Sequence, residues 1–284
     1  METKCNGMNG GRSPRGLAAR IGLGLIATAL AAGCQTVQTT QGGQVGVTRS
    51  QLMSVSAEEI TAASEQSYRK MLQAADRGNK LNRDPVMLAR VQGIAKRLIP
   101  QVVHFRADAL QWRWETNVFQ SEEVNAFCMA GGKIGIYSGL IDRVKITDDE
   151  LAAVMGHEIA HALREHVREQ ISAQQAARLP GLVLAVVTGS EILADLGNAV
   201  TNVTLTLPKS REAEKEADEI GVELAARAGY DPRAAVTLWQ KMNRLGGSRP
   251  PEILSTHPAP ESREQDLART AAVVMPLYEQ SRRR

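Results

Sequence analysis

The stretch Ala153-Val154-Met155-Gly156-His157-Glu158-Ile159-Ala160-His161-Ala162-Leu163 decides what the rest of this chain folds around. It contains the pattern His-Glu-x-x-His, and residues four apart on a helix share a face, with Cβ atoms about 5–6 Å apart. His157 and His161 can therefore bind one cation at roughly 2.0–2.1 Å, the distance that Zn²⁺ prefers. Glu158 points about 100° away from His157 round the helix. It lies where a carboxylate can take a proton from metal-bound water. The pattern predicts a zinc site on a helix.

The sequence also predicts where this helix begins. Thr147-Asp148-Asp149-Glu150 has the form of a capping box, with Thr147 as the N-cap and Glu150 three positions later. An apolar stripe at helical spacing follows it, made of Leu151, Val154, Met155, Ala162 and Leu163. The alternative is that two core-facing histidines flank a glutamate by chance, since short motifs have false positives. The remaining chain must decide between the two.

The first 33 residues have the features of a secretory signal. Arg12, Arg15 and Arg20 form a positive region. The apolar stretch 21–32 that follows it is too short to span a bilayer. The formal charge of the whole chain is +3, and residues 1–33 carry all of it. The remainder is formally neutral, so its composition indicates no nucleic-acid-binding surface.

The signal ends in Leu30-Ala31-Ala32-Gly33-Cys34, which resembles a bacterial lipoprotein box with Cys34 as the lipidated residue. Ala31 stands where leucine is usual. By resemblance to Gram-negative lipoproteins, Gln35 after the cysteine favours sorting to the outer membrane, so we expect a lipid-anchored protein on the periplasmic face of that membrane. The alternative is ordinary cleavage that leaves a soluble periplasmic protein. A cytoplasmic protein with a buried apolar helix at its start is a third interpretation.

The three cysteines leave no pair for an intramolecular disulfide. Cys5 would be lost with the signal and Cys34 would carry lipid, which leaves Cys128 alone. We expect Cys128 to be a small buried hydrophobe and not a reactive thiol.

The chain is expected to divide into a signal (1–33), a flexible tether (34–55) and one metal-binding domain (56–284). The tether is rich in Gln, Thr and Gly, and its residues 35–50 would span roughly 20–25 Å. Residues 170–210 fit either a lid or surface loop or ordinary helices; the apolar run 182–187 is too short to span a membrane. Apolar periodicity predicts helices at 57–75, 84–99, 231–245 and 260–283, and strands at 110–114 and 133–137.

A catalytic zinc needs a third protein ligand beside the two histidines. Spacing singles out Glu214, because Ala217, Asp218 and Gly221 follow it on one helical side, and small residues there would let this helix approach the metal helix. Asp218 could then accept a hydrogen bond from the free ring nitrogen of a ligand histidine. The alternative is that the glutamates of 212–219 form a solvated helical face.

Several separate motifs follow one another between about residue 60 and residue 270. They are Asn125-Ala126-Phe127 with Gly131-Gly132, Gly156 to His161, Ser210-Arg211-x-x-Glu214-x-x-Ala217-Asp218, Ala228 to Pro232, and Ser255-Thr256-His257-Pro258 with Arg263. Together they resemble the HtpX and CAAX-prenyl-protease family of zinc metallopeptidases. The resemblance is strongest to its periplasmic BepA-like members and its outer-membrane lipoprotein members, and the chain lacks the transmembrane helices of the HtpX branch. One departure is Cys128-Met129-Ala130, where the family commonly has a proline before the paired glycines.

This resemblance implies an α+β, mostly helical gluzincin fold with a small β-sheet beside the active-site helix. It implies one Zn²⁺ per chain and endopeptidase activity on misfolded or stalled outer-membrane proteins. It also implies that the strand Lys133-Ile134-Gly135-Ile136-Tyr137 borders the cleft and binds substrate as an added strand, a mode that is largely blind to sequence.

Glu158 is then the predicted general base, acting on the water of a zinc held by His157, His161 and Glu214. His257 and Arg211 are candidates for a second oxyanion donor. In BepA-like relatives a histidine in the loop that matches His257 caps the zinc as a fourth ligand, so a latch is the other role for this residue.

His166 lies five residues after His161, which places it off the metal face, and we expect a structural role for it. A non-proteolytic chaperone or assembly factor on the same zinc fold is the alternative function. The intact general base argues against it, because a site that only binds has no need of one.

Overall fold

The computed structural model describes residues 35–178, 189–245, 251–258 and 262–283. The predicted signal, Cys34 and the apolar run 182–187 lie outside these ranges. Residues Thr36–Arg284 belong to one compact unit. None of the described helices combines the length and the apolar character needed to cross a membrane.

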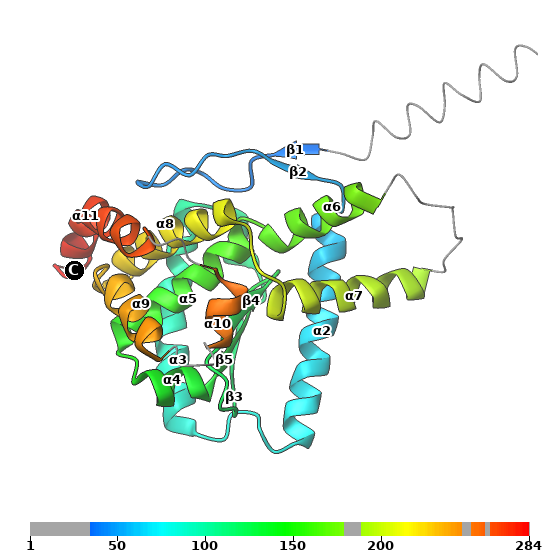
Figure 1. Cartoon of the computed structure of the whole chain (residues 1–284), viewed down its shortest axis with the longest axis horizontal. Helices are drawn as coiled ribbons and strands as arrows, with labels where there is room; N and C mark the ends of the chain where they lie inside the picture. The colour runs from blue at the N-terminus through cyan, green and yellow to red at the C-terminus, as the bar shows by residue number, and fades with distance from the viewer. Residues whose placement is uncertain (1–34, 179–188, 246–250, 259–261, 284) are drawn as a thin grey trace, which may run out of the picture. The chain divides into compact units, whose positions relative to one another are not determined.

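Helix α5 (Asp148–Leu163) lies at the centre of the fold (Figure 1) and begins as the sequence predicts. The Thr147 backbone N–H donates to Glu150 Oε2 at 2.8 Å, and the Glu150 N–H donates to Thr147 Oγ1 at 3.3 Å, which completes the capping box. The helix is buried along nearly its whole length. It packs on α8 (Arg211–Arg227), on α9 (Ala234–Leu245) and on strand β4 (Ala126–Met129).

The sheet beside α5 has three strands in the order β3-β5-β4, where β3 is Glu115–Phe119 and β5 is Lys133–Tyr137. β5 runs parallel to β3 and antiparallel to β4. The strand predicted at 133–137 is confirmed, and so is the α+β, mostly helical fold class. Gly131 and Gly132 form the turn before it at φ +78° and +81°, in the region that favours glycine.

The predicted strand at 110–114 is wrong. The chain forms a 3₁₀ turn there, η2 (Ala107–Gln111), and β3 begins only at Glu115. The indole N–H of Trp114 donates to the Ala109 carbonyl at 2.8 Å, and its ring stacks on Trp112 at 5.5 Å. The alternation of these tryptophans therefore reflects stacking over a turn and not the two faces of a strand.

The prediction that Lys133–Tyr137 binds substrate as an added strand is also wrong. β5 is the central strand, and its main-chain groups pair with β3 on one side and β4 on the other. An added strand needs an unpaired edge. In the part of the chain that the structure describes, β4 has β5 as its only strand neighbour, so the edge beside α5 belongs to β4.

The other predicted helices form with small shifts at their ends. Segment 170–210 is helical on both sides of residues 179–188, where α6 (His166–Arg178) ends and α7 (Gly189–Leu205) begins. For the described part of this segment, the structure therefore favours ordinary helices over a loop. The remaining helical elements are α2 (Ala57–Arg77), α3 (Pro85–Leu98), η1 (Ile99–His104), α4 (Ser138–Val144), α6 (His166–Arg178), α7 (Gly189–Leu205), α10 (Glu252–Thr256) and α11 (Arg263–Ser281).

Residues 36–53, here called the N-terminal strap, lie on the domain instead of forming the expected flexible tether. They include strand β2 (Gln51–Met53) and all but the first residue of strand β1 (Gln35–Val37), and the two strands pair with each other. The Gln41 N–H donates to the Phe105 carbonyl at 2.7 Å. Only 5% of Val47 and 1% of Gln51 are exposed. Main-chain hydrogen bonds and polar side chains hold the strap, which is why its composition resembles that of a linker.

Candidate metal centre

Four side chains from three parts of the chain meet beside α5. His157 and His161 come from α5, Glu214 from α8, and His257 from the residue that follows α10. One ligand atom from each lies within 4.8 Å of the others. The structure thus brings together the three predicted ligands and adds His257 to them.

The ring nitrogens of the two α5 histidines are arranged as metal ligands. Asp218 Oδ1 lies 3.0 Å from His157 Nδ1. A carboxylate only accepts hydrogen bonds, so Nδ1 carries a proton, and Nε2 is the atom that offers a lone pair whenever the ring is neutral. His161 Nε2 lies 3.0 Å from this atom and 3.3 Å from Glu214 Oε1. Two ring nitrogens and a carboxylate that face one another at these distances form a ligand set that one shared cation would hold together.

Two buried oxygens in this cluster point to the same conclusion. Glu158 Oε1 and Glu214 Oε2 are both inaccessible to solvent and make no hydrogen bond among the described residues, although His257 Nε2 lies 3.4 Å from the first and Arg263 Nη1 lies 3.2 Å from the second. An unsatisfied buried polar atom costs roughly 1–3 kcal/mol, and more when it is charged. Two imidazoles and a carboxylate are also the donor set of one class of catalytic zinc site. The residues present therefore fit a zinc ion.

The electrostatics of the cluster favour positive charge within it. Burial alone would lower the pKa of His157, but hydrogen bonds and charges from Asp218 and Glu214 more than offset this and raise it to about 9. Burial tends to raise the pKa of Glu214, and His257 and His157 overcome this and hold it well below its usual range. For His161, burial dominates and lowers its pKa well below the ordinary value, so its ring is neutral and able to bind a metal.

Helices α5 and α8 approach closely enough for Glu214 to join the histidines because glycine faces glycine at their crossing. A Cβ on Gly156 would lie 2.6 Å from the Gly221 carbonyl oxygen, and a Cβ on Gly221 would lie 2.6 Å from the His157 nitrogen. The sequence interpretation of Gly221 as a close-approach position is confirmed. Its partner on α5 is the residue directly before the first ligand.

Arg263 is a site residue whose role sequence reasoning missed. Its guanidinium lies 3.2 Å from Glu214 Oε2 and 2.7 Å from Asp218 Oδ1, and it stacks 3.6 Å from the centre of the Trp239 ring. It therefore holds the carboxylate ligand and the partner of His157 in one arrangement. The motif match at Arg263 singled out the residue, but only the packing of α11 on α8 reveals its contacts.

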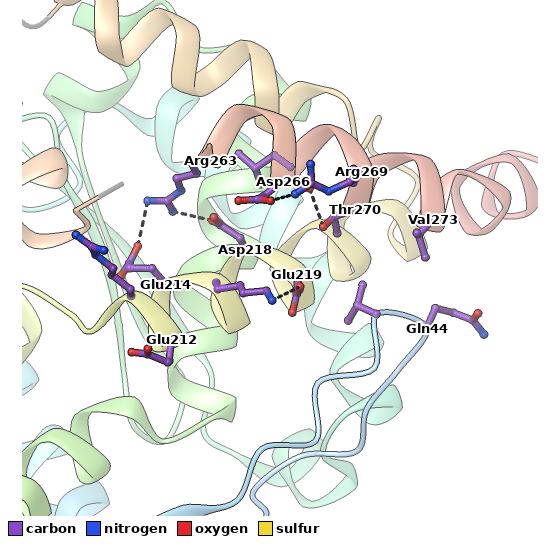
Figure 2. Close-up of a pocket in the computed structure, with 14 residues that line it drawn as sticks. Gln44, Glu212, Glu214, Asp218, Glu219, Arg263, Asp266, Arg269, Thr270 and Val273 are labelled. Carbon is purple, nitrogen blue, oxygen red and sulfur yellow. Dashed lines mark hydrogen bonds and ion pairs between the residues drawn. The ribbon is translucent and has the colours of Figure 1, made fainter. Parts of the chain in front are cut away.

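The two candidate oxyanion donors lie in different surroundings. His257 Nε2 is 3.4 Å from Glu158 Oε1, and both residues line a small apolar cavity between α5 and α9. Arg211 is exposed and lines a pocket of about 500 Å³ between α8 and α11 (Figure 2), which Glu214 and Asp218 also line but Glu158 and His257 do not. The structure brings His257 to the proposed base and leaves Arg211 outside that cavity.

His166 is not independent of the metal face, because its Nδ1 lies 2.8 Å from His161 Nδ1, the ring nitrogen that faces away from the cluster. Helix α5 ends at Leu163 and α6 begins at His166. This break in the helix brings the two histidines together, which helical spacing could not predict. Cys128 is buried, and burial raises its thiol pKa well above the ordinary value, in agreement with its predicted role as a hydrophobe.

Comparisons with known proteins agree with this geometry. The model of peptidase family M48 matches residues 86–271, which include all four side chains of the cluster. The mitochondrial metalloendopeptidase OMA1 of Arabidopsis thaliana is 43% identical over 155 residues, 55% of this chain and 31% of the relative. OMA1 of Saccharomyces cerevisiae is 33% identical over 188 residues, 64% of this chain and 53% of the relative.

A bacterial relative is similar over a longer part of the chain. The beta-barrel assembly-enhancing protease of Escherichia coli K12 is 32% identical over 210 residues, 70% of this chain and 42% of the relative. The chain thus spans between about a third and a half of the length of these curated relatives.

Proposed function

The chain belongs to peptidase family M48, and from this premise we propose that it is a zinc-dependent endopeptidase that hydrolyses peptide bonds in unfolded polypeptides. The observation that carries the proposal is the position of Glu158. It is buried beside the four-residue cluster, and its Oε1 has no hydrogen-bond partner among the described residues. A buried carboxylate oxygen that makes no hydrogen bond is destabilising for the fold, and a carboxylate beside the metal is the group that a hydrolytic reaction needs.

In this proposal each residue of the cluster has a separate task. His157, His161 and Glu214 hold the zinc, which when bound lowers the pKa of a water molecule and polarises the substrate carbonyl. Glu158 accepts the proton of the attacking water and delivers it to the leaving amine. Asp218 fixes the tautomer of His157 from 3.0 Å away.

We propose that β4 binds the substrate as an added strand in place of the expected β5. The Tyr137 N–H donates to the Asn125 carbonyl, and hydrogen-bonded pairs alternate along an antiparallel ladder. The peptide groups of Ala126 and Cys128 therefore point away from β5, where the Ala126 N–H donates to the Asn125 side chain at 2.9 Å. Cys128 and His161 line one small cavity, which supports a position of this edge next to the metal.

We further propose that the substrates are misfolded or stalled proteins of the bacterial envelope, including outer-membrane proteins. The name of the Escherichia coli relative supports this, since it describes a protease that enhances beta-barrel assembly. A lipid anchor at Cys34 would place the enzyme on the periplasmic face of the outer membrane, next to such substrates. Pairing through main-chain hydrogen bonds suits substrates of unrelated sequence.

The first test measures zinc content and casein cleavage for the purified protein and for Glu158→Gln. We expect about one zinc per chain in both, and a loss of cleavage on the order of 10²-fold or more in the variant, because the amide cannot accept the proton. A chelator should abolish cleavage by the parent protein.

Two results would contradict the proposal. Folded parent protein that binds no zinc would remove the metal site. If neither the zinc-loaded parent protein nor zinc-loaded His257→Ala cleaves an unfolded polypeptide, the result would favour the chaperone function on the same fold.

A further inference from the structure

The proton-bearing side of His161 faces a buried chain of polar residues that the proposed chemistry does not use. Metal-bound histidines almost always donate their second ring N–H to a fixed acceptor, which sets their tautomer and ring orientation. Asp218 is this acceptor for His157. For His161 the neighbour at this position is another histidine, His166.

We propose that His166 and Glu216 are positioning residues that orient His161, and that Arg49 of the N-terminal strap holds them in place. The N-terminal strap would then be part of the metal site and set its affinity for zinc. This inference rests on the metal site of the proposed function.

The hydrogen-bond directions along this chain follow from the ligand geometry. In the proposed metal site His161 Nε2 is a ligand, facing His157 and Glu214 at 3.0 and 3.3 Å, so the proton of the neutral His161 ring lies on Nδ1. Nδ1–H then donates to His166 Nδ1 at 2.8 Å. His166 must carry its own proton on Nε2, which donates to Glu216 Oε2 at 3.0 Å. Every donor has one acceptor, so the chain fixes a single tautomer of His161.

The far end of the chain is held by two arginines. Arg164 Nε donates to Glu216 Oε2 at 2.9 Å, and Arg49 Nε donates to Glu216 Oε1 at 2.6 Å. Arg164 is fully buried and Glu216 is 6% exposed. Both oxygens of the carboxylate are therefore fixed, and its charge is compensated inside the fold.

Arg49 comes from outside the region that the family model matches, which begins at residue 86. It also bonds Glu169 at 2.6 Å, and its carbonyl accepts from Arg164 Nη2 at 2.9 Å. The Gln51 side chain donates to the Arg164 carbonyl at 2.7 Å, at the C-terminal end of α5. The N-terminal strap thus contacts the end of the metal helix and the carboxylate behind His161 together.

The test compares His166→Phe and Arg49→Gln with the parent protein. Zinc affinity is measured by competition with a chromophoric chelator, and ligand geometry by the visible absorption of the cobalt-substituted protein. Loss of such an outer partner typically lowers metal affinity roughly 10–100-fold, which we expect for His166→Phe together with a changed cobalt spectrum. Arg49 is further from His161 along this chain of contacts than His166 is, so we expect Arg49→Gln to lower zinc affinity by a smaller factor.

Arg90→Gln is the matched control. Arg90 Nε donates to Asp148 Oδ1 at 2.6 Å, so it too is a partly exposed arginine that pairs with α5, but at the end of the helix away from His161. Its loss should leave zinc affinity and the cobalt spectrum unchanged. Circular dichroism of each chelator-treated variant shows whether it is folded before metal is added.

A purely structural role would lower the unfolding temperature of the chelator-treated variants and leave the zinc affinity of the folded protein unchanged. Affinities within about twofold of the parent for both variants, with an unchanged cobalt spectrum, would therefore overturn the inference. If His166→Phe does not fold, the result for Arg49→Gln decides. Parent protein that binds zinc but cleaves nothing would contradict the proposed function and leave this comparison intact.

Discussion

At the scale of single residues, His257 has the greatest influence on what the cluster can do. Its Nδ1 lies 2.8 Å from Glu214 Oε1 and 3.2 Å from His157 Nε2, and only 2% of the residue is exposed. A catalytic zinc has three protein ligands and keeps one position for water or substrate. A fourth protein ligand would close that position.

We therefore expect His257→Ala to increase casein cleavage. Activity scales with the fraction of molecules in which the fourth position is open, so a rise of roughly threefold or more follows if His257 fills it in most molecules. Zinc content should stay at about one per chain. Reduced cleavage with unchanged zinc content would instead assign His257 to the oxyanion, and would rule out a latch.

At the scale of elements, the contact between α5 and α8 determines whether the third ligand reaches the metal. The two backbones touch where Gly156 faces Gly221, and any side chain at that position would push the helices apart. Glu214 lies two turns before Gly221 on α8, so a small displacement at the crossing moves the carboxylate relative to both histidines.

Gly221→Ala should destabilise the protein by about 1–3 kcal/mol, because the added methyl group would meet backbone atoms of His157 that cannot move aside. It should also weaken zinc binding. Urea unfolding of the chelator-treated protein measures the first effect and chelator competition the second.

Gly93→Ala is the matched control for this substitution. Gly93 lies within α3, and a Cβ there has no atom within 4 Å. Alanine should stabilise that helix by roughly 0.5–1 kcal/mol, since it loses less conformational freedom than glycine on folding. Equal effects of the two substitutions would show that the crossing has no special requirement for glycine.

At the scale of the whole described domain, the N-terminal strap connects α6 and α8 through buried and partly buried charges. Glu169 on α6 accepts from Arg49 at 2.6 Å and from Gln51 at 2.6 Å. Burial tends to raise the pKa of Glu169, but these hydrogen bonds and the charge of Arg49 outweigh it, so its pKa is lower than the ordinary value.

This lowered pKa predicts an acid-dependent loss of stability. A carboxylate whose pKa is lower in the folded than in the unfolded state stabilises the fold above the unfolded pKa of about 4.3, and this contribution is lost as the pH falls through the folded pKa. The free energy of unfolding of chelator-treated protein should thus fall as the pH drops below about 5.

The acid-dependent fall in the free energy of unfolding should be smaller in Glu169→Gln, which has no carboxylate to titrate at this position. It should also be smaller in Arg49→Gln, which lacks the main charge that lowers the pKa. Identical pH profiles for the parent protein and both variants would show that the N-terminal strap makes no such contribution.

The sequence alone determined the metal helix and its ligands, because their signals are local. The capping box at Thr147, the four-residue spacing of the histidines and the small residues after Glu214 all depend on helical periodicity, which the fold preserves. Strand β5 and most helices follow from the same kind of pattern.

Only the tertiary structure decided which residues surround those ligands. His166, Arg263 and His257 reach the cluster through the end of one helix and the packing of others, over separations that no local period encodes. The central position of β5 depends on strand order, which one strand's sequence does not contain. The N-terminal strap is held by polar contacts and main-chain hydrogen bonds, so its composition could not distinguish an ordered segment from a linker.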